Sequence, residues 1–356
     1  KWQMAKKYMS CLIKNKIGLS IIGFLMLALQ VSGQMKIWEA SESAYLAKRG
    51  VKEFYLNSSD SVHDLSKPNS NYVTHGFCSL NGKPKLLLLH GITGTALLHY
   101  SYTMDYLRKD FDVVAIDLRG HGQTVNDTVD FSIEAQVEFV ADALYELSRQ
   151  FNDPSFESVI VVGHSYGGVV AASLAEKHPD MVRKLIIYDS PVGQYSSKSL
   201  DSLAIANGLP NGEAILSPKD YKEYCVRMKV GQYRLKWVPK ISAANNAIER
   251  YFEPRRKEQM GMIAYLRNKE SYLYDHKYNW KCRVLLLWGA NDQIVPLSTA
   301  LAIQKVYSDF YGKEMELFVY PKTGHVMSLE RPRKFAKFLK EHASVKTYRT
   351  VGTPSF

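Results

Sequence analysis

One serine of this sequence lies in a pattern that suits nucleophilic chemistry. Residues 163–167 read Gly-His-Ser-Tyr-Gly, between the apolar run 159–162 and a segment with helical propensity. In a sharp turn from strand to helix, such a serine takes a strained backbone conformation, and the flanking glycines leave room for the neighbouring elements. The Ser165 hydroxyl would then lie above the end of the strand, where the helix dipole favours negative charge. The pattern predicts that Ser165 is a nucleophile.

A serine hydroxyl is a weak nucleophile unless a base removes its proton, and a carboxylate commonly orients that base. Two later loops supply candidates, because Asp292 and His325 each follow the C-terminal end of a predicted strand. The chain order Ser, Asp, His suits a strand–turn–helix nucleophile. We therefore predict a triad of Ser165, His325 and Asp292. Asp189, which also follows an apolar run, is the alternative carboxylate.

A negatively charged tetrahedral intermediate needs two backbone donors for its oxygen. We expect one to be the amide of Tyr166, the residue after the nucleophile. The other should come from the loop after the run 86–89, where residues 90–94 read His-Gly-Ile-Thr-Gly. The amide of Ile92 is our choice. These two amides form the predicted oxyanion hole.

Short aliphatic and β-branched runs, separated by helix-length segments, must position these residues. They read as buried parallel strands in a βαβα order with right-handed crossovers. The expected strands are 86–89, 113–116, 159–162, 185–187, 284–287 and 317–319. The expected helices are 95–109, 132–151, 166–178, 298–307 and 329–342. Residues 52–56 and 71–80 are expected to add antiparallel edge strands. We predict an α/β fold with a mostly parallel central sheet flanked by helices.

The segment 191–280 breaks this alternation. It holds no convincing central strand, so we expect a helical lid inserted between the sixth and seventh strands. It carries 15 Lys and Arg residues against 9 Asp and Glu residues, an excess of six. If this charge, including Arg255, Arg256 and Lys257, faces the pocket entrance, it would favour anionic substrates or an anionic membrane surface. The alternative is an ordinary solvated helical face.

The N-terminal 33 residues have the layout of a signal peptide. Five lysines and no acidic residue surround or precede the apolar run 17–29, and small residues follow at 31–33. That run is shorter than the roughly 20 residues needed to cross a bilayer. We expect residues 1–33 to direct export of the remaining domain, residues 34–356. A permanent N-terminal anchor is the alternative.

Composition excludes several classes. The chain is 46% hydrophobic and 23% charged, as in ordinary globular proteins, and its net charge is +11. After residue 33 only Cys78, Cys225 and Cys282 remain, so at most one internal disulfide can form. No spacing suits a metal site, a phosphate-binding loop or nucleic-acid recognition, and we expect no cofactor. Nothing in the sequence indicates an oligomeric state.

Together these motifs resemble those of the α/β-hydrolase superfamily, and of its lidded esterases, lipases and carbon–carbon bond hydrolases. The resemblance covers about residues 52–342 and rests on the motifs at 90–91, 117–122, 163–168, 289–292 and 324–325. It implies a cofactor-free Ser-His-Asp hydrolase acting through an acyl-enzyme. Haloalkane dehalogenases and epoxide hydrolases are excluded, because they have an aspartate where this chain has Ser165. We expect Arg119, His121 and His164 to support the site without reacting.

The first functional hypothesis is an exported carboxylic-ester hydrolase, with a small-molecule or lipid-like ester as its substrate. A second hypothesis keeps the same residues for cleavage of a carbon–carbon bond or for acyl transfer. A third is a ligand-binding receptor that has the fold without turnover, which an intact triad disfavours.

Overall fold

The computed structural model describes residues 34–57, 72–126, 130–234, 238–312 and 314–343. Its centre is a sheet with the strand order β1-β2-β4-β3-β6-β7-β8-β9. The strands from β4 to β9 along this order are parallel, and β1 and β2 pair antiparallel at one edge. The strands are β1 (Val51–Asn57), β2 (Tyr72–Ser79), β3 (Lys85–Leu89), β4 (Asp112–Ile116), β6 (Val159–His164), β7 (Val182–Tyr188), β8 (Arg283–Gly289) and β9 (Glu316–Tyr320).

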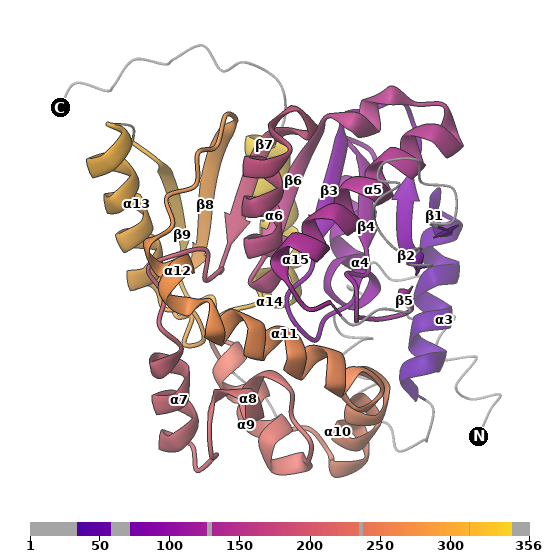
Figure 1. The fold of residues 1–356 in the computed structure, drawn as a ribbon. Helices are drawn as coiled ribbons and strands as arrows, with labels where there is room; N and C mark the ends of the chain where they lie inside the picture. The colour runs from indigo at the N-terminus through magenta and orange to yellow at the C-terminus, as the bar shows by residue number, and fades with distance from the viewer. Residues whose placement is uncertain (1–33, 58–71, 127–129, 235–237, 313, 344–356) are drawn as a thin grey trace.

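Helices cover both faces of this sheet (Figure 1). They are α3 (Gln34–Ala47), α4 (Ala96–Leu107), α5 (Ile133–Phe151), α6 (Tyr166–Lys177), α13 (Leu297–Tyr311), α14 (Met327–Glu330) and α15 (Pro332–His342). All residues of β3 are buried, and their side chains alternate between two hydrophobic clusters. Leu87 and Leu89 pack with α5 and α6, while Leu86 and Leu88 pack with α3, α4 and α15. A strand covered on both faces is apolar throughout, which explains the run of four leucines.

The predicted α/β-hydrolase fold is confirmed, with two additions. A two-residue strand, β5 (Val125–Asn126), pairs with β2 and is too short to leave a pattern in the sequence. Helix α3 precedes β1 and packs on α4, although no helix was expected there. The ends of most predicted elements shift by one to four residues in either direction, as is usual for boundaries, and the predicted helix 329–342 is divided into α14 and α15.

Between β7 and β8 the chain forms helices and no strand in the residues described. These inserted helices are α7 (Ser197–Ala206), α8 (Gly212–Leu216), α9 (Tyr221–Gly231), α10 (Ile241–Ala247), the π-helical turn η4 (Ile248–Phe252), η5 (Glu253–Arg255), α11 (Arg256–Asn268) and α12 (Glu270–Asp275). Figure 1 shows α7 to α11 gathered below the sheet. We call this group the inserted helices.

The structure also bears on the cysteines and on a possible membrane span. Cys78, Cys225 and Cys282 are all free thiols, so the single disulfide that the sequence allowed is not formed. In the part of the chain described, no helix is both long and apolar enough to cross a membrane. The expected signal peptide, residues 1–33, lies outside the described residues.

Candidate active site

Ser165 occupies the turn from β6 into α6. Its backbone has φ 49° and ψ −120°, a conformation that residues other than glycine rarely adopt. The turn is held from two sides, because Ser165 N donates to Tyr188 O over 3.1 Å and Ser190 Oγ donates to Ser165 O over 2.6 Å. Such strain persists only where the surroundings fix it, and it is typical of functional turns.

The two glycines beside this turn are required by space. A Cβ atom on Gly163 would lie 2.5 Å from Gly167 O, and one on Gly167 would lie 2.4 Å from His90 O. Both contacts are with backbone atoms, which cannot move aside without shifting β3 or α6. The glycine spacing is therefore what allows strand, turn and helix to pack so closely.

Asp292 and His325 meet across two neighbouring loops. Asp292 follows β8, His325 follows β9, and His325 Nδ1 lies 2.8 Å from Asp292 Oδ2. The other carboxylate oxygen, Oδ1, accepts the amides of Ile294 and Val295 at 2.8 and 3.0 Å. Both side chains are buried, so this geometry holds the imidazole in one orientation. The sequence-predicted pair is thus brought into contact.

Asp189, the alternative carboxylate, has a different environment. It is completely buried, and its Oδ1 accepts the amide of Gly289 over 2.8 Å. Burial, followed by the nearby Asp292 carboxylate, raises the pKa of Asp189 well above its ordinary value. Asp189 therefore fastens β8 through the amide of Gly289, and Asp292 is the carboxylate that contacts His325.

The loop after β3 packs directly against the nucleophile turn. A Cβ atom on Gly91 would lie 2.8 Å from His164 Nδ1 and 3.1 Å from Ser165 Cβ. Ile92, next in this loop, lines the same cavity as Ser165. Tyr166 is the first residue of α6, so its amide has no partner within the helix. Both predicted oxyanion donors thus lie beside Ser165.

Two cavities meet at Ser165 and Ile92. The larger has a volume of about 210 Å³ and is also lined by His325. Its wall combines aromatic and apolar side chains from α3, α4 and the inserted helices, among them Trp38, Leu98, Met228 and Phe252. The smaller cavity, about 80 Å³, lies on the side of α7, α11 and α12. The space beside Ser165 is therefore divided into a larger and a smaller cavity.

The same fold recurs in known proteins. A sequence profile described as "alpha/beta hydrolase fold" matches residues 84–332, which is more than half of the chain. The chain belongs to the α/β-hydrolase family. Among curated relatives of this α/β-hydrolase, monoacylglycerol lipase ABHD6 of Bos taurus is 28% identical over 292 residues, which cover 75% of this chain and 80% of the relative.

Another relative is the dihydrolipoyllysine-residue acetyltransferase component of the acetoin cleaving system of Cupriavidus necator. It is 28% identical over 274 residues, 73% of this chain, but the match spans only 64% of that relative. Among solved structures, 2-hydroxy-6-oxo-6-phenylhexa-2,4-dienoate hydrolase of Rhodococcus sp. strain RHA1 has a TM-score of 0.64 at 22% identity, covering 82% of this chain and 99% of that one. At this identity the likeness shows a shared fold.

Four further histidines surround the site of this α/β-hydrolase. Burial lowers the pKa of each of them, and that of His121 falls to about 3, so all four are neutral at pH 7. They are His90, His99, His121 and His164. His164 Nε2 lies 2.8 Å from His325 O, and His90 Nε2 accepts the amide of Leu118. His164 therefore supports the backbone of the candidate base, and His121 Nδ1 lies 3.0 Å from Arg119 O.

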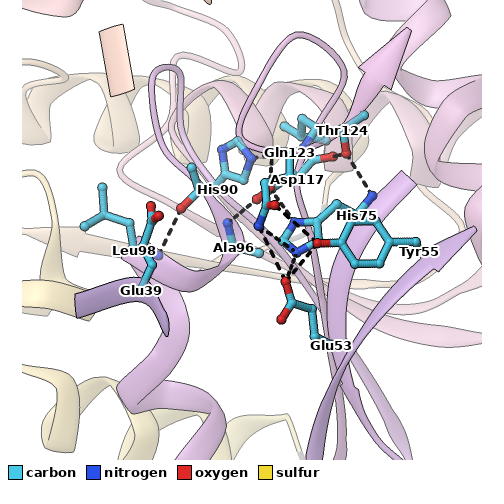
Figure 2. A network of polar contacts seen from close by, with 12 residues as sticks. Glu39, Glu53, Tyr55, His75, His90, Ala96, Leu98, Asp117, Gln123 and Thr124 are labelled. Carbon is cyan, nitrogen blue, oxygen red and sulfur yellow. Dashed lines mark hydrogen bonds and ion pairs between the residues drawn. The ribbon is translucent and has the colours of Figure 1, made fainter. Parts of the chain in front are cut away.

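A polar network joins the start of α4 to the edge strands (Figure 2). Asp117, in the loop after β4, accepts the amide of Ala96 through Oδ1 at 2.7 Å, and its Oδ2 lies 2.7 Å from His75 Nδ1. His75 Nε2 lies 2.9 Å from Glu53 Oε1. Although burial opposes it, hydrogen bonds and charges of Asp117 and Glu53 raise the pKa of His75. The motif at 117–122 thus fixes the start of α4, just beyond the loop that carries Ile92.

The basic triplet of the inserted helices lies away from the two cavities that meet at Ser165. Arg255 donates to Thr124 O at 3.1 Å, and Arg256 donates to Ser217 O and Pro218 O at 2.6 and 2.9 Å. Lys257 is exposed. None of the three lines either cavity that meets at Ser165. The two arginines thus hold loops together and do not face the cavities at Ser165.

Sequence reasoning missed two residues that line the larger cavity. Trp38 comes from α3, and Arg227 comes from α9. Neither lies in a local motif, and their positions depend on how distant helices pack.

Proposed function

We propose that this α/β-hydrolase cleaves carboxylic esters through an acyl-enzyme on Ser165. One observation carries the proposal: a serine in a strained strand-to-helix turn faces the same cavity as His325, whose Nδ1 is fixed by Asp292 at 2.8 Å. A nucleophile, its base and the base's orienting carboxylate then lie in the loops where this chemistry needs them.

In the proposed reaction, His325 Nε2 takes the proton of Ser165 Oγ as the oxygen attacks the ester carbonyl. The amides of Ile92 and Tyr166 donate to the resulting oxyanion. His325 then gives its proton to the departing alcohol oxygen, and the C–O bond breaks. Water, deprotonated by His325, attacks the acyl-enzyme and releases the acid and the free serine.

The walls of the site favour a lipid-like ester. The larger cavity is lined mostly by apolar and aromatic side chains, so transfer of an alkyl chain from water into it is favourable. The relative named a monoacylglycerol lipase suggests an ester of this kind. We propose a small-molecule or lipid-like ester as the substrate class.

Turnover of p-nitrophenyl esters of graded acyl length tests this function. The purified protein should hydrolyse at least one of them, and Ser165→Ala should lower kcat by about 10⁶-fold. Ser202→Ala, at an exposed serine on α7, is the matched control and should leave kcat unchanged. Failure of wild type to hydrolyse any ester would favour carbon–carbon bond cleavage, acyl transfer or a receptor role.

We also propose that residues 1–33 direct export. The support is the basic and apolar order of that segment. Expression of the full chain followed by N-terminal sequencing of the secreted protein tests it. A mature N-terminus near residue 34 is expected, and retention of the segment on membrane-bound protein would instead indicate an anchor.

Contact with an anionic membrane is a further part of the proposal. Exposed apolar side chains lie near lysines on the inserted helices, among them Val238 and Ile241 on either side of Lys240. Such a surface combines apolar insertion with attraction to anionic lipid. Ile241→Asp should reduce cosedimentation with phosphatidylserine vesicles and leave turnover of a soluble ester unchanged. Equal cosedimentation of wild type and variant would contradict the proposed membrane contact.

A further inference from the structure

We infer that Arg227 is a positioning residue that holds the oxyanion loop through Thr93, an inference that rests on the proposed function and adds a residue to it. Arg227 lies on α9 and lines the larger cavity together with Ser165. Its Nη2 donates to Thr93 Oγ1 over 2.8 Å. Since Thr93 directly follows Ile92, one hydrogen bond joins the inserted helices to the loop that supplies an oxyanion donor.

Thr93 needs such support because its backbone is strained. Its φ is 63°, in the left-handed region where a β-branched residue is a rare exception. Its Oγ1 accepts from Arg227 and donates to Ile92 O over 2.5 Å. The side chain is 3% exposed, so water cannot readily replace either partner. The hydroxyl therefore fixes the peptide between Ile92 and Thr93 from both sides.

Arg227 is itself held rigidly. Its Nη1 donates to Ile215 O and Leu216 O at 3.1 and 2.7 Å, at the end of α8, and its guanidinium lies 5.2 Å from the ring centre of Phe252. Among the residues described, no carboxylate lies within 4.0 Å of it. Burial lowers the pKa of Arg227 to about 10, which leaves it charged at pH 7. A charged donor gives a stronger bond to Thr93 than a neutral one would.

This arrangement makes the oxyanion site depend on the inserted helices. With α8 and α9 in place, Arg227 keeps Thr93 in its left-handed conformation and Ile92 beside Ser165. Without that bond, Thr93 can relax, and the Ile92 amide turns away from the position where the oxyanion forms. Loss of Arg227 should therefore weaken transition-state binding, with little effect on binding of the substrate itself.

A double-mutant cycle tests the inference. Arg227→Met and Thr93→Val should each lower kcat for a neutral p-nitrophenyl ester by about 10- to 100-fold. This fall in kcat is no larger than the fall that follows removal of a whole oxyanion donor. KM should change less than about twofold, because the lost interaction acts in the transition state. The double variant should be no slower than the slower single variant, since both remove the same bond. Thr93→Ser, which keeps the hydroxyl, should retain wild-type kcat within about threefold.

Arg256→Met is the matched control. Arg256 also lies in the inserted helices and also donates to carbonyl groups just after α8, but its partners are Ser217 and Pro218. Its kcat should stay within about twofold of wild type. An equal fall in Arg256→Met, or effects of Arg227→Met and Thr93→Val that multiply, would show that only helix packing was lost and would overturn the inference. So would a higher KM for carboxylate-bearing esters alone, which would make Arg227 a substrate-binding residue.

A second readout separates this inference from the proposed function. Reaction of Ser165 with a fluorophosphonate develops negative charge on an oxygen in the same site, so its rate reports the oxyanion donors without any ester turnover. Arg227→Met should slow labelling by about the factor seen in kcat. If wild type is labelled but turns over no ester, the proposed function fails while this rate still decides the inference. Equal labelling rates in wild type and Arg227→Met would overturn it.

Discussion

Two aspartates at the ends of neighbouring strands differ in what surrounds their carboxyl groups. Asp292 accepts two amides through Oδ1 and contacts His325 Nδ1 through Oδ2, so both oxygens have donors. Asp189 is buried beside Asp292, accepts one amide and has its pKa raised by burial and by that neighbour. The environment of each residue, more than its place in the sequence, assigns it a role.

Asparagine substitutions test this difference. Asp292→Asn should lower kcat by about 10⁴-fold, because an amide cannot stabilise the imidazolium or keep its tautomer. Asp189→Asn keeps the shape of the side chain and an oxygen that can accept the amide of Gly289, so kcat should change less than about fivefold. Steady-state kinetics on one ester would measure both. A larger loss in Asp189→Asn than in Asp292→Asn would reverse the assignment.

Residues in local motifs were predictable, and residues placed by packing were not. Ser165 could be located because its turn demands glycines within two positions, and Asp292 and His325 because each follows a recognisable strand. Arg227 has no such signal, since its contact with Thr93 joins positions 134 residues apart. The orientation of the basic triplet at 255–257 was left open for the same reason, because composition shows charge but not the carbonyl groups that Arg255 and Arg256 bind.

Among the elements, the edge strands β1 and β2 have a further task. Glu53 of β1 and His75 of β2 continue the network of Asp117, which holds the first residue of α4. Both partners of the His75–Asp117 pair have side chains only 2% exposed. Breaking a buried pair of this kind commonly costs about 3–5 kcal/mol. The pairing of two edge strands thereby stabilises a loop beside the site.

His75 should make stability depend on pH. Its pKa in the folded protein is raised above the ordinary value of 6.5, so its contribution is complete below pH 6.5 and is lost as the pH rises through the raised value. Conversely, the pKa values of Asp117 and Glu53 are lowered in the folded protein. These two carboxylates therefore stabilise the fold when the pH is above their ordinary pKa values, and this stabilisation is lost in acid. Urea unfolding of wild type should therefore show a fall in unfolding free energy as the pH rises above 6.5. His75→Gln should be less stable at pH 6 and lack this fall; an identical pH profile would contradict the assignment.

Strand composition predicted these elements well in the centre and less well at the margins. Every residue of β3, β4 and β6 is buried on a sheet covered on both faces, and that burial leaves a continuous apolar run. β5 has two residues and α3 has an almost uniform distribution of apolar residues around its axis, so neither left a clear periodic pattern. Both elements form because β2 and α4 offer them a surface.

For the whole molecule, the inserted helices and the sheet together enclose the space around Ser165. The larger cavity is closed by α3 and α4 from the core and by α9, α10 and η4 from the insert, whereas the smaller one is closed by α7, α11 and α12. For the proposed ester substrate, the cavity volumes of about 210 and 80 Å³ predict that the larger group binds in the first cavity. We therefore expect selectivity for chain length to depend on both the core and the inserted helices.

Filling each cavity in turn tests this division. Leu98, which is only partly buried, lines the larger cavity, and Leu98→Trp would place an indole ring there. This variant should raise KM for a dodecanoyl ester by about tenfold or more and leave KM for an acetyl ester unchanged. Leu266→Trp does the same in the smaller cavity and should affect the long-chain ester less. KM values for both esters would measure the effect. A greater loss in Leu266→Trp would place the long chain in the smaller cavity.

The central claim is that Ser165 is the nucleophile, and covalent labelling tests it most directly. Purified protein treated with a fluorophosphonate and digested should carry the label on the peptide that contains Ser165, and mass spectrometry would locate it. The account predicts one modified residue, Ser165, and no labelling of Ser165→Ala under the same conditions. Labelling at another residue, or labelling of Ser165→Ala at the wild-type rate, would contradict it.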